Sequence, residues 1–437
     1  MSISLSRWGI PALVLASYLN FFVALDLGPA NLRPSMIVLL ALAGPWLLLV
    51  SRRGRMRVPG FWSVLALVIT FWGATLLNYD SPYIQRGVIS CLLLALNVMH
   101  YILVTDGLGH ASLGRLDHVV SILIGGGVIY GLSALAGVVL TLLGIPNNLV
   151  AVMWLQAYQG APYEGPMPLN GFGTVTASYL ASVLVMLLGR LLYRGRARWY
   201  EWLGVGVLGL DVLNSYSRGA WLGTIVGGGV LIVTLLSQRT KRLGRLLAVG
   251  FIVGLLSVML WWVLQVVTPT VTTILQARFG RFFDLDDGTV SDRRRLWLLL
   301  WEDLWSSPLI GHGADAYQAF ITRPGEVVES LLFEVLHSSG FLGVAFLFMP
   351  ILTQAIRAVH ALRRVQHPSV PIELLVMTTG GFATLLAATQ TNPAWQGAFY
   401  WIVLALWATS VGQICRSRAG DAEVGSLPDV LTREVAE

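Results

Sequence analysis

Long apolar segments recur along the whole chain, and they limit the folds open to it. Most are about 17 to 25 residues long, the length at which an α-helix crosses the hydrocarbon core of a bilayer. A transmembrane barrel would instead show segments of about ten residues with alternating polarity. Inside lipid, only helices and closed barrels satisfy every backbone hydrogen-bonding group. We therefore predict an all-α polytopic membrane protein.

The composition agrees with burial in lipid. Hydrophobic residues make up 55% of the 437 residues and charged residues only 12%, about half the charged share of ordinary soluble domains. The formal net charge is +6, which in a soluble protein could indicate binding to nucleic acid. Here the basic residues cluster between apolar segments, so the membrane surface accounts for them and no nucleic-acid partner is expected.

Twelve transmembrane helices are predicted, within a single integral membrane domain covering residues 1–437. They span about 8–27, 33–50, 62–78, 83–104, 118–144, 174–192, 200–216, 219–236, 244–268, 329–356, 372–390 and 397–415. The first segment lacks a polar region with a small-residue cleavage site. We therefore expect it to be a retained span and not a cleaved signal peptide.

The connections between these segments alternate in charge, and five of them carry clusters of basic residues. The clusters are Arg52, Arg53, Arg55 and Arg57; Arg190, Arg194, Arg196 and Arg198; Arg239, Lys241, Arg242 and Arg245; Arg357, Arg363 and Arg364; and Arg416 and Arg418. The positive-inside rule places such connections in the cytoplasm. With twelve spans, both termini are then cytoplasmic too.

The segment 269–328, between the ninth and tenth predicted spans, is the longest extracytoplasmic loop. It carries arginines on the side where they are scarce: Arg278, Arg281, Arg293, Arg294, Arg295 and Arg323. Either a long loop crosses regardless of its charge, or these arginines form an anion site. Trp297, Leu300, Trp301 and Leu304 follow helical spacing and predict an amphipathic helix over about 292–306. It would lie in the outer membrane interface or pack on the top of the bundle.

A polar group interrupts the apolar sequence where the seventh predicted span ends and the eighth begins. It contains Asp211 and the sequence Ser217-Arg218-Gly219. An arginine here could extend to the interface with no further role, but ionisable groups at membrane depth usually face a cavity and are functional. Guanidinium groups stay protonated and bind phosphate bidentately. Arginines here and in the long loop could bind a lipid diphosphate from two sides.

Acidic residues and a histidine gather at the start of the tenth predicted span. Glu329 lies near the interface, where it could act as a general base, or it could complement a helix dipole. Glu334 and His337 have the spacing of a di-iron half-site, but such sites need a second copy of the motif, and the sequence holds none. We therefore expect no metal.

Three sequence elements together resemble the O-antigen ligase and polymerase superfamily, over about residues 170–345. The elements are Ser217-Arg218-Gly219-Ala-Trp-Leu-Gly223; Arg293 with Trp297 four residues later and then Pro308-Leu309-x-Gly311-x-Gly313; and Glu329-Ser330 followed by Gly340-x-x-Gly343. Members of this superfamily are bacterial inner-membrane glycosyltransferases. They act at the periplasmic face on glycans linked to undecaprenyl diphosphate.

The resemblance implies a metal-independent transfer without a cofactor. Arg218 and Arg293 would hold the diphosphate leaving group, and Glu329 or His337 would take the proton from the acceptor hydroxyl. Further candidates for contact with the diphosphate are Arg278, Arg281, Arg294, Tyr216 and His312. Implied partners are the lipid-linked donor, a glycan acceptor, membrane lipids, and possible chain-length regulator and flippase proteins.

One position favours the polymerase branch, which joins lipid-linked repeat units. Ligases that transfer glycan to lipid A core resemble each other in a histidine eleven residues before the first glycine of G-x-x-G, and this chain has Glu329 there. The ligase remains the alternative. A twelve-span transporter or flippase is a third hypothesis, which the outward position of the long loop disfavours.

Overall fold

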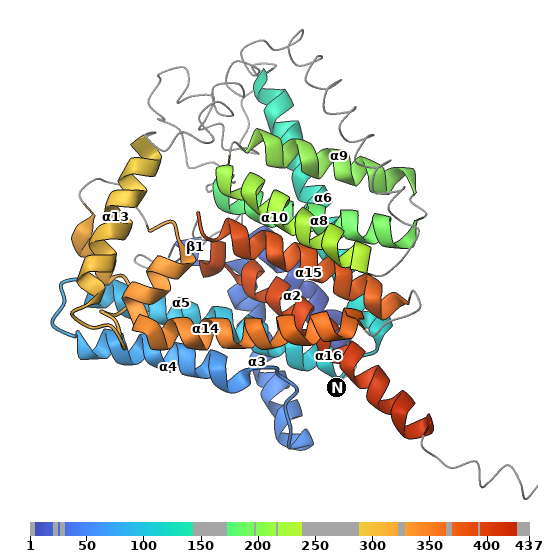
Figure 1. Ribbon diagram of the computed structural model, residues 1–437, viewed down its shortest axis with the longest axis horizontal. Coiled ribbons are helices and arrows are strands. Elements are labelled where there is room, and N and C mark those ends of the chain that lie inside the picture. Colours follow the sequence, from blue (N-terminus) through green and yellow to red (C-terminus); the bar gives the residue numbers. More distant parts are fainter. Residues whose placement is uncertain are drawn as a thin grey trace, which may run out of the picture.

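The computed structural model shows an elongated bundle of α-helices (Figure 1). It describes residues 5–20, 25–26, 31–142, 173–195, 198–215, 217–237, 288–321, 328–363, 369–391 and 394–425. Everything below concerns these ranges. The predicted ninth span, 244–268, lies outside them, as do the Pro- and Gly-rich segment 145–172 and much of the long loop.

Twelve α-helices form in the described ranges. They are α2 (Ile10–Leu19), α3 (Pro34–Arg53), α4 (Phe61–Leu77), α5 (Ile84–Gly109), α6 (Leu113–Leu142), α8 (Gly173–Arg194), α9 (Trp199–Asn214), α10 (Arg218–Ser237), α13 (Gly288–Leu304), α14 (Leu331–Arg363), α15 (Val370–Ala388) and α16 (Ala398–Gly425). The short elements are the π-helix η1 (Leu5–Gly9), the 3₁₀-helices η2 (Ala316–Phe320) and η3 (Ala394–Gln396), and the strands β1 (Leu25–Asp26) and β2 (Asn31–Leu32).

Eight of these helices are long and apolar enough to cross a membrane: α3, α5, α6, α8, α10, α14, α15 and α16. The apolar helix α4 has 17 residues. The prediction of a polytopic α-helical membrane protein is thus confirmed, while the total of twelve spans remains a prediction. Helices α5 and α14 run beyond their predicted ends, because apolar length marks only the part of a helix that lies in lipid.

The first predicted span, 8–27, is too long. Helix α2 ends at Leu19, and residues 25–26 pair with residues 31–32 in an antiparallel two-stranded sheet. The sequence between the two strands contains Gly28 and Pro29, which favour turns over helix. The predicted span wrongly included the strand Leu25–Asp26, because a short apolar run is compatible with either helix or strand.

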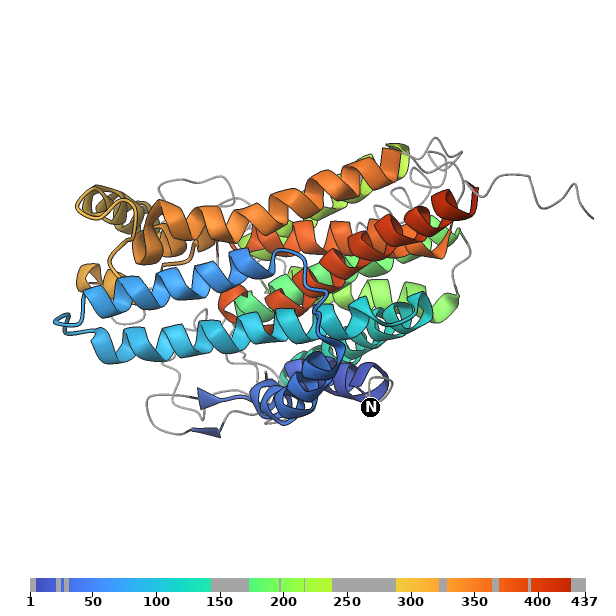
Figure 2. The same ribbon diagram turned by 90° about the horizontal axis from the view of Figure 1, so that it is seen from below.

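Small residues let α15 pack closely between α8 and α10. A Cβ added to Gly223 of α10 would lie 2.5 Å from the Thr384 backbone oxygen, and one on Gly227 would overlap the Thr384 side chain. Small side chains at helix contacts are typical of membrane bundles, where tight packing replaces the hydrophobic effect. Figure 2 shows α14 on one side of this bundle and the N-terminal helices on the opposite side.

Basic connections gather at one end of the bundle. Arg57 donates its backbone N–H to Asp106, and Arg190 lies between Asp117 and Glu373 in a buried ion-pair cluster. These contacts bring the basic connections after α3 and α8 together at that end. This grouping is the one that the charge alternation predicts.

The opposite end, called the site end below, is where α10 and α14 begin and α15 finishes. A Cβ on Gly223 would lie 3.0 Å from Cβ of Ala388, near the C-terminus of α15. The Leu331 N–H donates to the Thr389 carbonyl at 2.9 Å. Arg218, the first residue of α10, is therefore at the same end of the bundle as Glu329.

Candidate active site

Helix α13 lies across the site end, steeply inclined to α14 (Figure 1). Its Leu296, Leu300 and Leu304 are buried, whereas Trp301 and Trp305 are exposed. The amphipathic helix predicted over about 292–306 is thus confirmed at Gly288–Leu304. Its leucine face packs on the protein, and exposed tryptophans are suited to the membrane interface.

The spacing of Arg293 and Trp297 puts both side chains on one face of α13. The Arg293 guanidinium forms an ion pair with Glu329, and the Trp297 ring stacks on Phe333 with ring centroids 5.1 Å apart. The partners on the other side, Glu329 and Phe333, are also four residues apart. The arginine-tryptophan motif therefore fixes the first half of α13 against the start of α14, and it brings together two of the predicted site residues.

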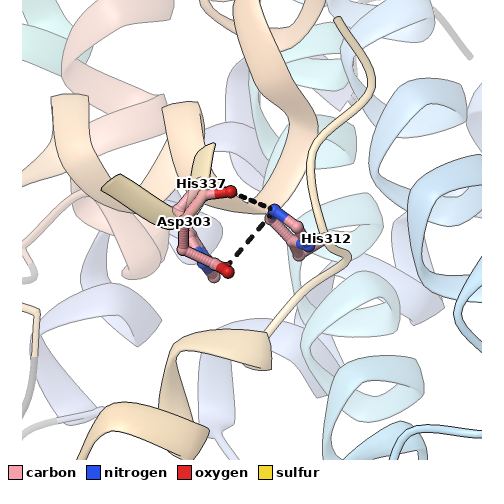
Figure 3. A group of neighbouring side chains, drawn as sticks. All are labelled: Asp303, His312 and His337. Atoms are coloured by element: carbon pink, nitrogen blue, oxygen red, sulfur yellow. Dashed lines mark hydrogen bonds and ion pairs between the residues drawn. The ribbon is translucent and has the colours of Figure 1, made fainter. Parts of the chain in front are cut away.

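The C-terminal end of α13 meets two histidines (Figure 3). His337 Nε2 lies 2.9 Å from Oδ2 of Asp303, and His312 Nε2 lies 3.3 Å from the same oxygen. The two imidazole centroids are 4.9 Å apart. Asp303 was not predicted as a site residue. A signal for it was present, since it occupies an inward position of the helical stripe formed by Leu296 and Leu300.

The Glu334-x-x-His337 spacing does not create a shared metal site. The Glu334 carboxylate accepts hydrogen bonds from Trp395 Nε1 at 2.9 Å and from Gln396 Nε2 at 2.5 Å, while His337 turns to Asp303. Tyr317 lies near this carboxylate, and burial together with its negative charge raises the pKa of the phenol. Glu334 thus anchors the start of α14 to η3.

The glycines of the two sequence motifs interlock through the backbone. Helix α14 is broken at Gly340, whose φ is +64°. The freed Phe341 N–H donates to the Pro308 carbonyl at 2.9 Å, and the His312 N–H donates to the His337 carbonyl at 2.9 Å. Pro308-Leu309-x-Gly311-x-Gly313 is therefore a loop docked onto the break in α14, and this docking places His312 beside His337.

Replacing Gly311 by alanine should destabilise this docked loop. Gly311 has a φ of +78°, and an added Cβ would lie 2.6 Å from the backbone nitrogens of Ser339 and Gly340. Positive-φ strain and overpacking together should lower the free energy of unfolding by at least about 2 kcal/mol.

Thermal unfolding in detergent tests this, with Gly73→Ala as the matched control. Gly73 lies in α4, and its added Cβ would meet nothing within 4 Å. The control should therefore keep its Tm or gain slightly from better helix propensity. Equal Tm values for the two variants would show that the docked loop is absent in solution.

The Ser217-Arg218-Gly219 element forms the start of α10. Ser217 caps the helix, because its Oγ accepts the Ala220 N–H at 3.2 Å. Trp221 donates its indole N–H to the Val212 carbonyl at 2.9 Å, which ties α10 back to α9. Arg218 is half-buried in the first turn. A cation there opposes the helix dipole, so its placement favours an anion nearby.

Two of the remaining candidates lie within the described residues, and three lie outside them. Arg294 is exposed on α13, and His312 belongs to the Asp303 cluster. Arg278, Arg281 and Tyr216 lie outside the described residues.

The family model described as O-antigen ligase matches residues 203–348. The matched region contains the start of α10, all of α13 and the docked loop at the break in α14. The match covers about a third of the chain and supports the O-antigen ligase and polymerase superfamily. No curated protein matches the chain.

The family match and the helices together indicate a multi-pass bacterial membrane protein with a transferase activity of the O-antigen ligase or polymerase kind, acting on lipid-linked glycans. Arg218, Arg293, Glu329 and His337 all fall within the matched region. The superfamily assignment made from three short motifs is thereby confirmed. The match does not separate the ligase branch from the polymerase branch.

Proposed function

We propose that this protein is a polysaccharide polymerase of the inner membrane. It moves a growing glycan from undecaprenyl diphosphate onto a sugar hydroxyl of another lipid-linked repeat unit at the periplasmic face, without a metal in the transfer step. The observation that carries the proposal is the Arg293–Glu329 ion pair, which lies at the same end of the bundle as Arg218.

Arg218 and Arg293 bind the diphosphate of the donor. Arg218 adds its charge to the N-terminus of α10, where the helix dipole already favours anions. Arg293 approaches from α13, a separate element. Two guanidinium groups held in place before the reaction stabilise the negative charge that develops on the leaving diphosphate.

Glu329 acts as the general base. When the diphosphate binds Arg293, it competes with Glu329 for the guanidinium and releases the carboxylate. Glu329 then takes the proton from the acceptor hydroxyl while the acceptor oxygen bonds to the anomeric carbon. The bond from that carbon to the diphosphate oxygen breaks, and undecaprenyl diphosphate leaves with the bonding electrons. Donor binding and base activation are thus coupled.

Exposure favours Glu329 over His337 as this base. The Glu329 side chain is 25% exposed, although its Oε2, which faces Arg293, is buried. His337 is only 1% exposed, and its Nε2 is directed at Asp303. A general base must come within hydrogen-bond reach of the proton that it removes, and the partly exposed Glu329 meets this condition once the diphosphate has drawn Arg293 away from its buried Oε2.

The residue at position 329 also supports the polymerase branch over the ligase branch. Glu329 stands where lipid A core ligases resemble each other in a histidine. A carboxylate paired with an arginine is a different base from an imidazole. We therefore associate the glutamate with a lipid-linked acceptor. A chain-length regulator and a flippase would be partners in such a pathway.

Reconstitution with defined substrates tests the proposed activity. The purified full-length protein in liposomes, supplied with lipid-linked repeat units alone, should produce a ladder of longer lipid-linked glycans. Product formed only after lipid A core is added would identify a ligase instead. Movement of the lipid-linked glycan across the bilayer with no new glycosidic linkage would identify a transporter.

A further inference from the structure

Asp303, His312 and His337 form a cluster of metal-ligating side chains that the proposed transfer does not use. One ligand atom from each residue lies within 4.8 Å of the other two. Three separate elements supply these residues: the end of α13, the docked loop and the first part of α14. The cluster is partly to fully buried, with His337 1% exposed.

The distances suit a small tetrahedral centre. Zinc binds histidine nitrogen and carboxylate oxygen at about 2.0–2.2 Å, so ligand atoms in a tetrahedral site lie about 3.3 Å apart. His337 Nε2 lies 2.9 Å and His312 Nε2 3.3 Å from Oδ2 of Asp303, and His312 Nε2 also lies 3.1 Å from the Asp303 main-chain oxygen. Imidazole and carboxylate together select zinc-like divalent ions over magnesium or calcium, which prefer sets of oxygen ligands.

We propose that Asp303, His312 and His337 bind one zinc-like divalent metal ion that fastens α13 and the docked loop to α14. Asp303 is ten residues from Arg293, about 15 Å along the helix axis. The ion therefore takes no part in binding the diphosphate. It adds a second attachment point for α13, beyond the contact of Arg293 with Glu329.

The rival explanation is a cluster held by hydrogen bonds alone. His337 would then donate its Nε2–H to Oδ2 of Asp303, and His312 would donate its Nε2–H to the Asp303 main-chain carbonyl. The two explanations differ in what they predict for added metal: the ion raises the stability of the folded chain by mass action, whereas the hydrogen-bonded cluster responds to neither a metal nor a chelator.

Metal analysis of the full-length protein in detergent tests the proposal. The protein is stripped with a chelator and then titrated with Zn²⁺ or Co²⁺. We expect one ion per chain, the visible absorption bands of tetrahedral Co²⁺, and a higher Tm with Zn²⁺. A stripped wild-type chain that takes up no stoichiometric metal and keeps its Tm would overturn the proposal without recourse to any variant.

Two variants identify the ligands. His312→Gln and Asp303→Asn should each weaken Zn²⁺ binding by more than about 100-fold. Even the loss of a residue that only hydrogen-bonds to a metal ligand lowers the affinity by about 10- to 100-fold. Glu302→Gln removes an exposed neighbouring carboxylate and should bind as the wild type does. Wild-type affinity in both ligand variants would place any bound ion elsewhere. None of these readouts depends on glycan transfer, so this proposal can fail while the transferase proposal stands.

Discussion

Replacing Arg218 or Arg293 by alanine is expected to lower glycan transfer by on the order of 100- to 1000-fold. This is the loss typical of removing one preorganised donor to the developing negative charge. Because the two arginines stabilise the same diphosphate, the double variant should lose less than the product of the single losses. The measurement is the initial rate of ladder formation from lipid-linked repeat units in liposomes.

The control is Arg55→Ala, an exposed arginine at the opposite end of the bundle, which should keep wild-type turnover. The Arg293–Glu329 pair is partly exposed and adds only about 0–1 kcal/mol of stability, so Arg293→Ala should remain folded with a similar Tm. Arg293→Lys keeps the charge but loses the planar fork, and its rate should be intermediate. Near-normal turnover in both alanine variants would defeat the diphosphate assignment.

The Glu329→Gln variant is expected to lose transfer by about 100- to 10 000-fold, the usual contribution of a general base. Its donor affinity should hold or rise, since the amide no longer competes with the diphosphate for Arg293. The same ladder assay gives the rate, and binding of undecaprenyl diphosphate to the purified variant gives the affinity. This split between rate and binding separates a base from a diphosphate ligand.

Glu302→Gln is the matched control for this variant, because it removes an exposed carboxylate from α13 outside the proposed machinery. It should change neither rate nor affinity. If Glu329→Gln transfers glycan at the wild-type rate, the base is another group. If it fails to bind the donor, the role of Glu329 is to position Arg293.

The bundle was largely predictable because lipid makes apolar length a reliable sign of helix. Helices α8, α10 and α15 lie close to their predicted ranges. The first span was overextended because a short apolar run is compatible with either a helix or the strand found at Leu25–Asp26. The break at Gly340 was not predicted, since a helix can contain a G-x-x-G motif without interruption. The docking of the loop Pro308–Gly313 accounts for the positive φ of Gly340.

Candidate site residues could be named from the sequence, but the contacts between them could not. Helical spacing placed Arg293 and Trp297 on one face, yet nothing in the sequence indicated that Glu329, 36 residues further along, would meet that arginine. Asp303 was not predicted, because only its place on the leucine stripe of α13 marks it in the sequence. Its partners come from the docked loop and α14, and contacts between such distant segments depend on tertiary packing.

The most direct test of the account is a structure of the protein with undecaprenyl diphosphate bound. We expect guanidinium groups of both Arg218 and Arg293 within hydrogen-bond distance of the diphosphate oxygens, and Glu329 moved from Arg293 toward the position of the anomeric carbon. A diphosphate bound elsewhere, with the Arg293–Glu329 pair intact, would contradict both the clamp and the coupling of donor binding to the base.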